Sequence, residues 1–220
     1  MDYSHVIWDF DGTLFDTYPH TAQAFLNILK KEYLVNENII EIEAQMRVSM
    51  QYAYDYYKDK FEIDDEFIQK FEEYRLIYEN TYALPHNNAY LVSRFIFDQG
   101  SANYLYTHRD KTVISMMQKH GFYELFKDFV TSENNLPRKP SPDGLVYLIK
   151  KHGMDKERTL YIGDREIDLQ CAKAAGVKFC LFSEDVNRTL NSKNEGVDFF
   201  VQNFSDLYYV LNATLSTKKS

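Results

Sequence analysis

Hydrophobic and polar positions follow two different patterns along the chain, and the change between them falls near Pro85. Between residues 18 and 84, apolar positions recur about every 3.6 residues, which is the repeat of an amphipathic helix. The clearest examples are residues 21–31 and 64–80, and no convincing strand pattern occurs in this stretch. A proline then interrupts any further helix. The pattern therefore predicts a block of helices.

Short apolar runs alternate with helical patterns in the rest of the chain. The predicted strands are residues 6–8, 102–106, 128–131, 159–162 and 177–182. Strands that alternate with helices form a parallel sheet covered by helices on both faces. We therefore predict an α/β fold, in which residues 1–16 and 85–220 form a Rossmann-like parallel-sheet core and residues 17–84 form an inserted α-helical domain.

Composition narrows the classes of protein and partner. The chain has 220 residues, of which 45% are hydrophobic, so it can bury a sizeable core. Its net charge of -8 argues against general affinity for nucleic acid or anionic membrane surfaces. No apolar run approaches the roughly 20 residues of a membrane span, and no secretory-signal pattern precedes the first strand.

Only two cysteines occur, Cys171 and Cys180, and they are expected to be reduced, buried thiols. With the composition, they predict a cytoplasmic protein with no nucleic-acid or membrane partner. We expect it to be a monomer or a homodimer that acts on a small molecule.

An acidic motif follows the first predicted strand. Asp9 and Asp11 are two residues apart, and side chains with this spacing share one face of an extended chain. Two converging carboxylates repel each other unless a proton or a divalent cation lies between them. Mg²⁺ is such a cation, and it prefers oxygen ligands. A strand end followed by an ordinary turn at Gly12 accounts for the same residues, so the motif alone leaves both interpretations open.

Three further polar clusters lie at predicted strand ends or in the loops after strands or before helices, and ligands of such sheets bind beyond the carboxyl ends of the strands. They contain Thr107, His108 and Arg109; Lys139; and Asp164 and Asp168. Together the clusters supply the groups that phosphoryl transfer through an aspartyl-phosphate needs. One carboxylate can attack phosphorus, a second can exchange the proton, and lysine and hydroxyl groups can bind phosphoryl oxygens.

The four motifs, in this order, resemble those of the haloacid dehalogenase superfamily on its phosphatase side. The matched residues are Asp9 to Leu14 for the first motif, Thr107 for the second, Lys139 for the third, and Asp164 with Asp168 for the fourth. The inserted helical block resembles the C1-type cap of this family, and the subgroup that the chain most resembles is the phosphoglycolate phosphatase-like proteins. The dehalogenase branch lacks an acid at the position of Asp11, which therefore points to phosphate esters, whose leaving alkoxide needs a proton.

The resemblance implies a role for each matched residue. The implied catalytic residues are Asp9 as nucleophile, Asp11 as general acid and base, Thr107 and Lys139. The implied ligands of Mg²⁺ are Asp9, Asp11 through its backbone carbonyl, Asp164, and Asp168 directly or through water. The candidate substrate-binding residues are Gly12, Thr13, Thr107, His108, Arg109, Lys139 and, in the cap, Arg47.

Some of these assignments have alternatives. Arg109 suits an anionic substrate, but an ion pair with a nearby acid explains it equally well. Arg47 lies where C1 caps often present a substrate-selecting loop. The function predicted is a Mg²⁺-dependent phosphatase of a small phosphorylated metabolite. A phosphosugar mutase of the same family and a non-catalytic, phospho-ligand-binding regulator are the alternatives.

Overall fold

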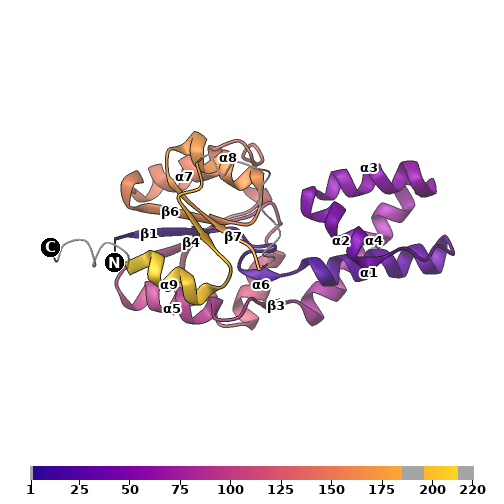
Figure 1. The fold of residues 1–220 in the computed structure, drawn as a ribbon, viewed down its shortest axis with the longest axis horizontal. Helices are drawn as coiled ribbons and strands as arrows, with labels where there is room; N and C mark the ends of the chain where they lie inside the picture. Colours follow the sequence, from indigo (N-terminus) through magenta and orange to yellow (C-terminus); the bar gives the residue numbers. More distant parts are fainter. Residues whose placement is uncertain (1, 185–195, 213–220) are drawn as a thin grey trace. The chain divides into compact units, whose positions relative to one another are not determined.

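The computed structural model describes residues 2–184 and 196–212. The chain divides into two compact units (Figure 1). The sheet unit consists of Met1–Leu14 and Pro85–Ser220, and the helical unit consists of Phe15–Leu84. No helix in the described ranges is long and apolar enough to cross a membrane.

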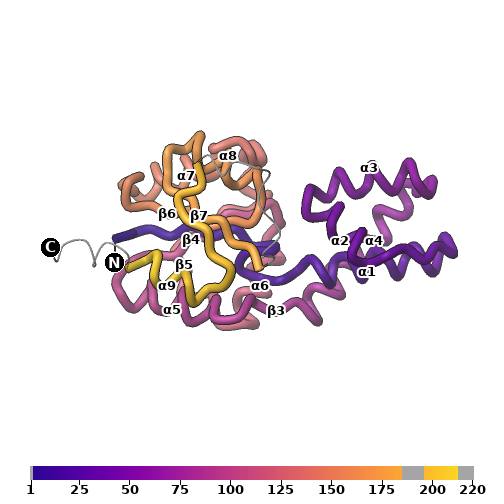
Figure 2. The backbone as a smooth tube through the Cα atoms, in the orientation of Figure 1, coloured from indigo at the N-terminus to yellow at the C-terminus, as the bar shows by residue number. Residues whose placement is uncertain are grey.

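Within the described residues, six strands of the sheet unit form one parallel sheet in the order β5-β4-β1-β6-β7-β8. They are β1 (His5–Trp8), β4 (Ala102–Tyr106), β5 (Phe126–Val130), β6 (Thr159–Gly163), β7 (Lys178–Phe182) and β8 (Phe199–Val201). The central strand β1 lies between β4 and β6, with Trp8 opposite Leu105 on one side and Ile162 on the other. Figure 2 follows the backbone through this sheet. The predicted α/β fold with a parallel sheet is confirmed.

Helices cover both faces of the sheet. The helices of this unit are α5 (Ala89–Asp98), α6 (Thr112–Lys119), α7 (Asp143–His152), α8 (Glu166–Ala175) and α9 (Phe204–Asn212). Short 3-10 helices occur at Tyr123–Leu125, Ser132–Asn134 and Lys156–Arg158. In Figure 1, α7 and α8 lie on one face, and α5 and α9 lie on the other. A strand that is covered on both faces has a continuous run of apolar residues in its sequence. Strand β1 is an example, because Val6, Ile7 and Trp8 are all fully buried.

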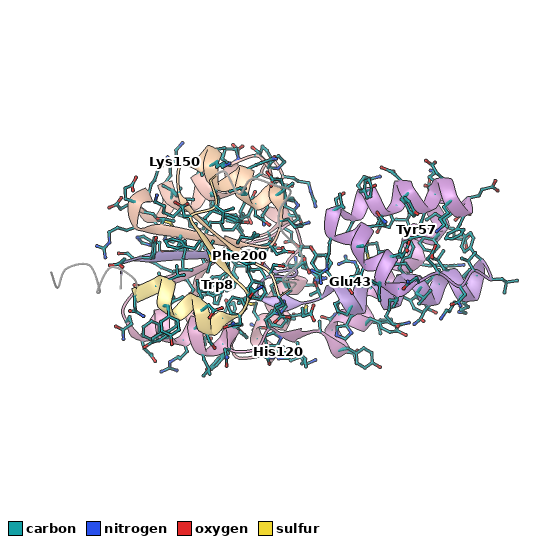
Figure 3. The ribbon with its side chains drawn as sticks, viewed as in Figure 1. Trp8, Glu43, Tyr57, His120, Lys150 and Phe200 are labelled. Carbon is teal, nitrogen blue, oxygen red and sulfur yellow. The ribbon has the colours of Figure 1, made fainter. Side chains whose placement is uncertain are left out.

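A buried polar pair fixes β1 against β4. The Trp8 indole Nε1–H donates to Oδ1 of Asn103 at 2.9 Å. The Asn103 amide nitrogen donates in turn to the backbone carbonyls of Ser93 (2.8 Å) and Leu125 (3.1 Å). Buried polar groups need such partners, so this network favours one register of the two strands. Figure 3 shows Trp8 within the sheet unit.

The helical unit is held together by aromatic residues. Its helices are α1 (Tyr18–Glu32), α2 (Ile39–Val48), α3 (Met50–Phe61) and α4 (Asp65–Tyr82). Phe25 of α1 contacts Tyr57 of α3 and Phe67 and Phe71 of α4, with ring centroids 4.7–5.2 Å apart. Figure 3 shows Tyr57 among these helices. Two short strands, β2 (Phe15–Asp16) and β3 (Leu84–Pro85), pair where the chain enters and leaves this unit.

The sequence analysis missed strand β8 at the edge of the sheet. This strand has only three residues, and it pairs with β7 through Cys180, Leu181 and Phe182. Phe200 is exposed, so the run lacks the buried pattern of the inner strands. The polar sequence before it gave no periodic signal. Its place in the sheet is decided by the partner strand.

Candidate functional site

The predicted motifs lie together at the edge of the sheet that is formed by the carboxyl ends of its strands, because each motif follows a parallel strand. Asp9 follows β1, Thr107 follows β4 and Asp164 follows β6, and these three strands are neighbours. The sheet hydrogen bonding continues just past the strands: the Asp9 N–H donates to the Ile162 carbonyl, and the Thr107 N–H donates to the Val130 carbonyl, both at 2.9 Å. The backbone of Asp9 and of Thr107 is thereby fixed to the neighbouring strands.

Three aspartates form a buried acidic cluster at this edge. Each of Asp9, Asp164 and Asp168 contributes an oxygen, and these atoms lie within 4.8 Å of one another. All three side chains are at most 2% exposed. Three carboxylates at this separation repel one another unless cations or protons compensate their charge.

Lys139 supplies one of these cations. Its Nζ lies 2.6 Å from Asp9 Oδ1 and 2.8 Å from Asp168 Oδ1, and its side chain is fully buried. Burial alone lowers the pKa of a lysine, but the carboxylates of Asp168 and Asp9 raise the pKa of Lys139 above its ordinary value. Lys139 is therefore charged in the folded protein. The loop before α7 brings this lysine to residues that are far away in the sequence.

Asp168 is held by hydrogen bonds on both oxygens. Its Oδ1 accepts from the Tyr161 hydroxyl at 2.7 Å as well as from Lys139, and its Oδ2 accepts from the Arg165 backbone N–H at 3.2 Å. Gly163 makes room for this side chain, because a Cβ there would lie 2.5 Å from the Asp168 Cβ. These contacts lower the pKa of Asp168 even though burial raises it. Asp168 is thus a fixed anion beside Lys139.

Sequence analysis assigned no role to Tyr161, Gly163 or Arg165, although all three belong to the site. Arg165 is a second cation at the acidic cluster. Its Nη2 lies 3.9 Å from Asp9 Oδ2, and its Nε lies 3.9 Å from an oxygen of Asp164 and from one of Asp168. The sequence signal for Gly163 and Arg165 was their place inside the fourth motif. Tyr161 gave no signal beyond that of a buried strand residue.

The two cations leave Asp9 incompletely compensated. Burial and the nearby carboxylates of Asp168 and Asp164 raise the pKa of Asp9 to about 7, even though Lys139 and Arg165 act to lower it. Among the described residues, Asp9 Oδ2 is buried and accepts no hydrogen bond. A buried carboxylate oxygen that lacks a hydrogen bond and lies beside another carboxylate, here that of Asp164, is suited to bind a hard divalent cation.

The turn after Asp9 brings a hydroxyl to the same cluster. Gly12 has a φ of 73°, a conformation that side-chain-bearing residues rarely adopt. The next residue, Thr13, is buried, and its Oγ1 donates to Asp164 Oδ1 at 3.4 Å. This turn therefore joins the first motif to the fourth.

Asp11, which directly precedes Gly12, forms an ion pair with Arg109. The Arg109 Nη1 lies 3.1 Å from Asp11 Oδ1. The Arg109 side chain is 5% exposed, and the Asp11 side chain is 28% exposed. Of the two interpretations of Arg109 from sequence, the structure shows the ion pair with an acid. Its predicted contact with substrate stays a prediction.

His108 fixes the backbone at Lys139. Its Nε2 accepts a hydrogen bond from the Lys139 backbone N–H at 2.7 Å. Burial lowers the pKa of His108 to about 3, and the charges of Lys139, Arg138 and Arg165 act in the same direction. His108 is therefore neutral near pH 7, with its proton on Nδ1. A cavity of about 290 Å³ lies beside it and is lined in part by Thr107 and Arg138.

Arg47 belongs to the helical unit. Its Nε and Nη2 both donate to Glu43 Oε1, at 2.9 and 2.6 Å. Its guanidinium also lies over the Tyr18 ring, 4.3 Å from the ring centre. The assignment of Arg47 to substrate binding stays a prediction.

Comparison with known proteins gives the class of the chain. Residues 6–182 match the family model described as haloacid dehalogenase-like hydrolase. The chain therefore belongs to this family, as the four motifs predicted, and it is an enzyme of the hydrolase class.

The relatives support phosphatase function within this family. A phosphoglycolate phosphatase from Pseudomonas fluorescens is 25% identical over 186 residues, which cover 79% of this chain and 66% of that protein. The pyrophosphatase PpaX from Oceanobacillus iheyensis is 22% identical over 214 residues, which cover 96% and 98%. The crystal structure of a predicted phosphoglycolate phosphatase from Haemophilus somnus superposes with a TM-score of 0.81 at 19% identity, covering 96% of this chain and 98% of that one. This last likeness shows the fold.

Proposed function

We propose that the chain is a Mg²⁺-dependent phosphatase that hydrolyses a small phosphorylated metabolite through an aspartyl-phosphate on Asp9. The observation that carries the proposal is the buried cluster in which Lys139 contacts Asp9 at 2.6 Å while Asp164 and Asp168 lie beside it. A buried carboxylate next to a fixed cation and an acidic metal-ligand set is an arrangement suited to nucleophilic attack on a phosphate.

In the first step, an oxygen of Asp9 attacks phosphorus, and the bond between phosphorus and the ester oxygen breaks. The electron pair of that bond goes to the ester oxygen, which takes a proton from Asp11 and leaves as an alcohol. Lys139 and the Thr107 hydroxyl bind the phosphoryl oxygens and stabilise the charge that develops on them. Asp168 holds the Lys139 ammonium in place at 2.8 Å, and the Tyr161 hydroxyl holds Asp168 by donating to it at 2.7 Å.

In the second step, Asp11 acts as the base. It takes a proton from water, the water oxygen attacks phosphorus, and the bond between phosphorus and Asp9 breaks. Inorganic phosphate leaves, Asp9 is again a carboxylate, and Asp11 is again protonated. The same residue serves both steps because the proton that it gives in the first is regained in the second.

The residues that would hold the metal are Asp9, Asp164 and the backbone carbonyl of Asp11. Mg²⁺ bound there would offset the repulsion between the Asp9 carboxylate and the anionic phosphate. We assign Asp168 mainly to the positioning of Lys139, since both of its oxygens already accept hydrogen bonds, with any metal contact made through water. Thr13 supports this set through its contact with Asp164.

The substrate is proposed to be small and anionic. The turn at Gly12 and Thr13 lies beside the cluster and would present backbone N–H groups to the phosphate, whereas His108, Arg109 and Arg47 are the candidates for contacts with the rest of the substrate. The names of the relatives put phosphoglycolate and pyrophosphate first in a substrate panel. The cytoplasmic location, the lack of nucleic-acid or membrane partners, and the monomeric or homodimeric state stay predictions from the sequence.

Phosphate release from a panel of phosphorylated metabolites tests this function. The purified protein is assayed with Mg²⁺ and with a chelator, and Asp9→Asn serves as the blank. Because the asparagine is nearly isosteric but a poor nucleophile, we expect a folded variant with no turnover. Release that persists in folded Asp9→Asn protein would remove Asp9 as nucleophile. Isomerisation of a hexose 1-phosphate without phosphate release would instead identify a mutase, and tight binding without turnover would identify a regulator.

A further inference from the structure

The ion pair between Asp11 and Arg109 joins two loops that follow neighbouring strands. Asp11 is in the loop after β1, and Arg109 is in the loop after β4. Their closest atoms, Oδ1 of Asp11 and Nη1 of Arg109, are 3.1 Å apart. Arginine is rarely as deeply buried as it is here unless its charge is compensated, so the carboxylate is an integral part of its environment.

Arg109 is fixed at its backbone as well as at its guanidinium. Its N–H donates to the Thr107 Oγ1 at 3.1 Å, and its carbonyl accepts from the Ser132 N–H at 2.8 Å. The guanidinium also lies over the Phe10 ring, 5.5 Å from the ring centre. An arginine held at both ends is a rigid support for the side chain that it contacts.

Asp11 needs such a support more than Asp9 does. The Asp11 side chain is 28% exposed, whereas the Asp9 side chain is 2% exposed and lies against Lys139. A partly exposed aspartate has several accessible rotamers, and proton transfer requires one of them. Misplacement of a reacting group by about 1 Å can cost on the order of 10²-fold in rate.

We propose that Arg109 is a positioning residue, which holds the Asp11 carboxyl group where it exchanges the proton of the leaving group. This inference rests on the proposed phosphatase function. The proposed roles of Arg109 and Lys139 differ. The lysine contacts the phosphoryl group of every substrate, whereas the arginine acts only through Asp11. Removal of Arg109 therefore matters most where the leaving group depends on a proton.

The dependence of rate on the leaving group tests the inference. The variant Arg109→Met keeps much of the volume of the side chain and removes its charge, and kcat and KM are measured with an alkyl phosphate and with 4-nitrophenyl phosphate. An alkoxide needs a proton to leave, whereas 4-nitrophenolate does not. We expect kcat/KM, which reports the steps up to formation of the aspartyl-phosphate and not its later hydrolysis, to fall on the order of 10²-fold for the alkyl ester and less than about 3-fold for the aryl ester.

Two further variants make the result specific. Asp11→Asn removes the proton donor, so adding Arg109→Met to it is expected to lower the alkyl-ester rate by less than about 3-fold more, because residues that act as a unit are not additive. Arg94→Met is the matched control, since it removes an arginine paired with Asp98 on the exposed surface of α5. It is expected to leave both rates unchanged. Circular dichroism checks folding, and Arg109→Lys, which keeps the charge, should show the same selectivity with a smaller loss.

An equal loss for both esters with a raised KM would overturn the inference and identify Arg109 as a direct contact of the substrate phosphate. Additive effects of Arg109→Met and Asp11→Asn would overturn it as well, because the two residues would then act independently. These outcomes differ from failure of the proposed function, in which the wild-type enzyme releases phosphate from no ester.

Discussion

Replacement of Lys139 by methionine tests the electrostatic account of the site. The lysine is fully buried between Asp9 and Asp168, with Nζ–Oδ1 distances of 2.6 and 2.8 Å. Methionine has a similar length and no charge, so the variant keeps most of the packing. It leaves the acidic cluster with Arg165, at 3.9 Å, as its closest described cation.

The expected cost follows from the burial of this pair. Removing one partner of a buried ion pair destabilises a protein by about 3–5 kcal/mol, because the other charge stays buried without compensation. For a chain of 220 residues, each kcal/mol corresponds to roughly 2–4 °C in the melting temperature, so we expect Lys139→Met to lower it by about 6–20 °C. Turnover is expected to be lost as well, since Lys139 is proposed to bind the phosphoryl oxygens.

Thermal unfolding in a chelator and in millimolar Mg²⁺ measures both effects. Lys151→Met is the matched control, because Lys151 pairs with Asp128 at 2.8 Å but is 46% exposed, and such a pair contributes about 0–1 kcal/mol. Mg²⁺ should raise the melting temperature of Lys139→Met more than that of the wild type, since the cation replaces the lost charge and binds only the folded state. A melting temperature within about 2 °C of wild type in the chelator would refute the reasoning.

Two further predictions concern residues that support the cluster. Gly163→Ala places a Cβ 2.5 Å from the Asp168 Cβ, so we expect a loss of about 1–3 kcal/mol in denaturant unfolding together with a fall in kcat; unchanged values would show that the strand end can shift freely. The pKa of His108 is about 3 in the folded state and about 6.5 in the unfolded state. Between these pH values the unfolded protein binds more protons than the folded protein. Protonation of His108 therefore lowers the free energy of unfolding as the pH falls from about 6.5 to 3. His108→Gln keeps an acceptor for the Lys139 N–H without titrating, and its melting temperature should therefore fall less than that of the wild type over this range; parallel curves would contradict the assignment.

Local sequence was enough to predict five of the six strands that the structure describes in the parallel sheet, and the polar residues that follow them. The apolar runs that became β1, β4 and β6 are buried on both faces, and such strands carry a continuous signal that needs no knowledge of the partner strands. Their parallel arrangement follows from the helices between them, and it brings the residues after each strand to one edge. The clustering of Asp9 and Asp164 follows from this argument alone. The two-residue spacing of Asp9 and Asp11 did not show that Asp11 pairs with Arg109 instead of joining the buried cluster.

The contacts that tune the site were decided by the tertiary structure. Lys139 lies between two carboxylates because a loop from the far side of β4 reaches across to β1 and β6, and no local pattern encodes that path. In the sequence, Tyr161 cannot be distinguished from other buried strand residues, and only the structure shows that its hydroxyl donates a hydrogen bond to Asp168 at 2.7 Å. The ion pair of Arg109 with Asp11 forms because the loops after β1 and β4 lie side by side, which the sequence did not show. The sequence determines which side chains reach this edge of the sheet, because the apolar pattern that predicts each strand is local. Which of these side chains pair with one another depends on the order of the strands and the paths of the loops, and only the folded chain fixes those.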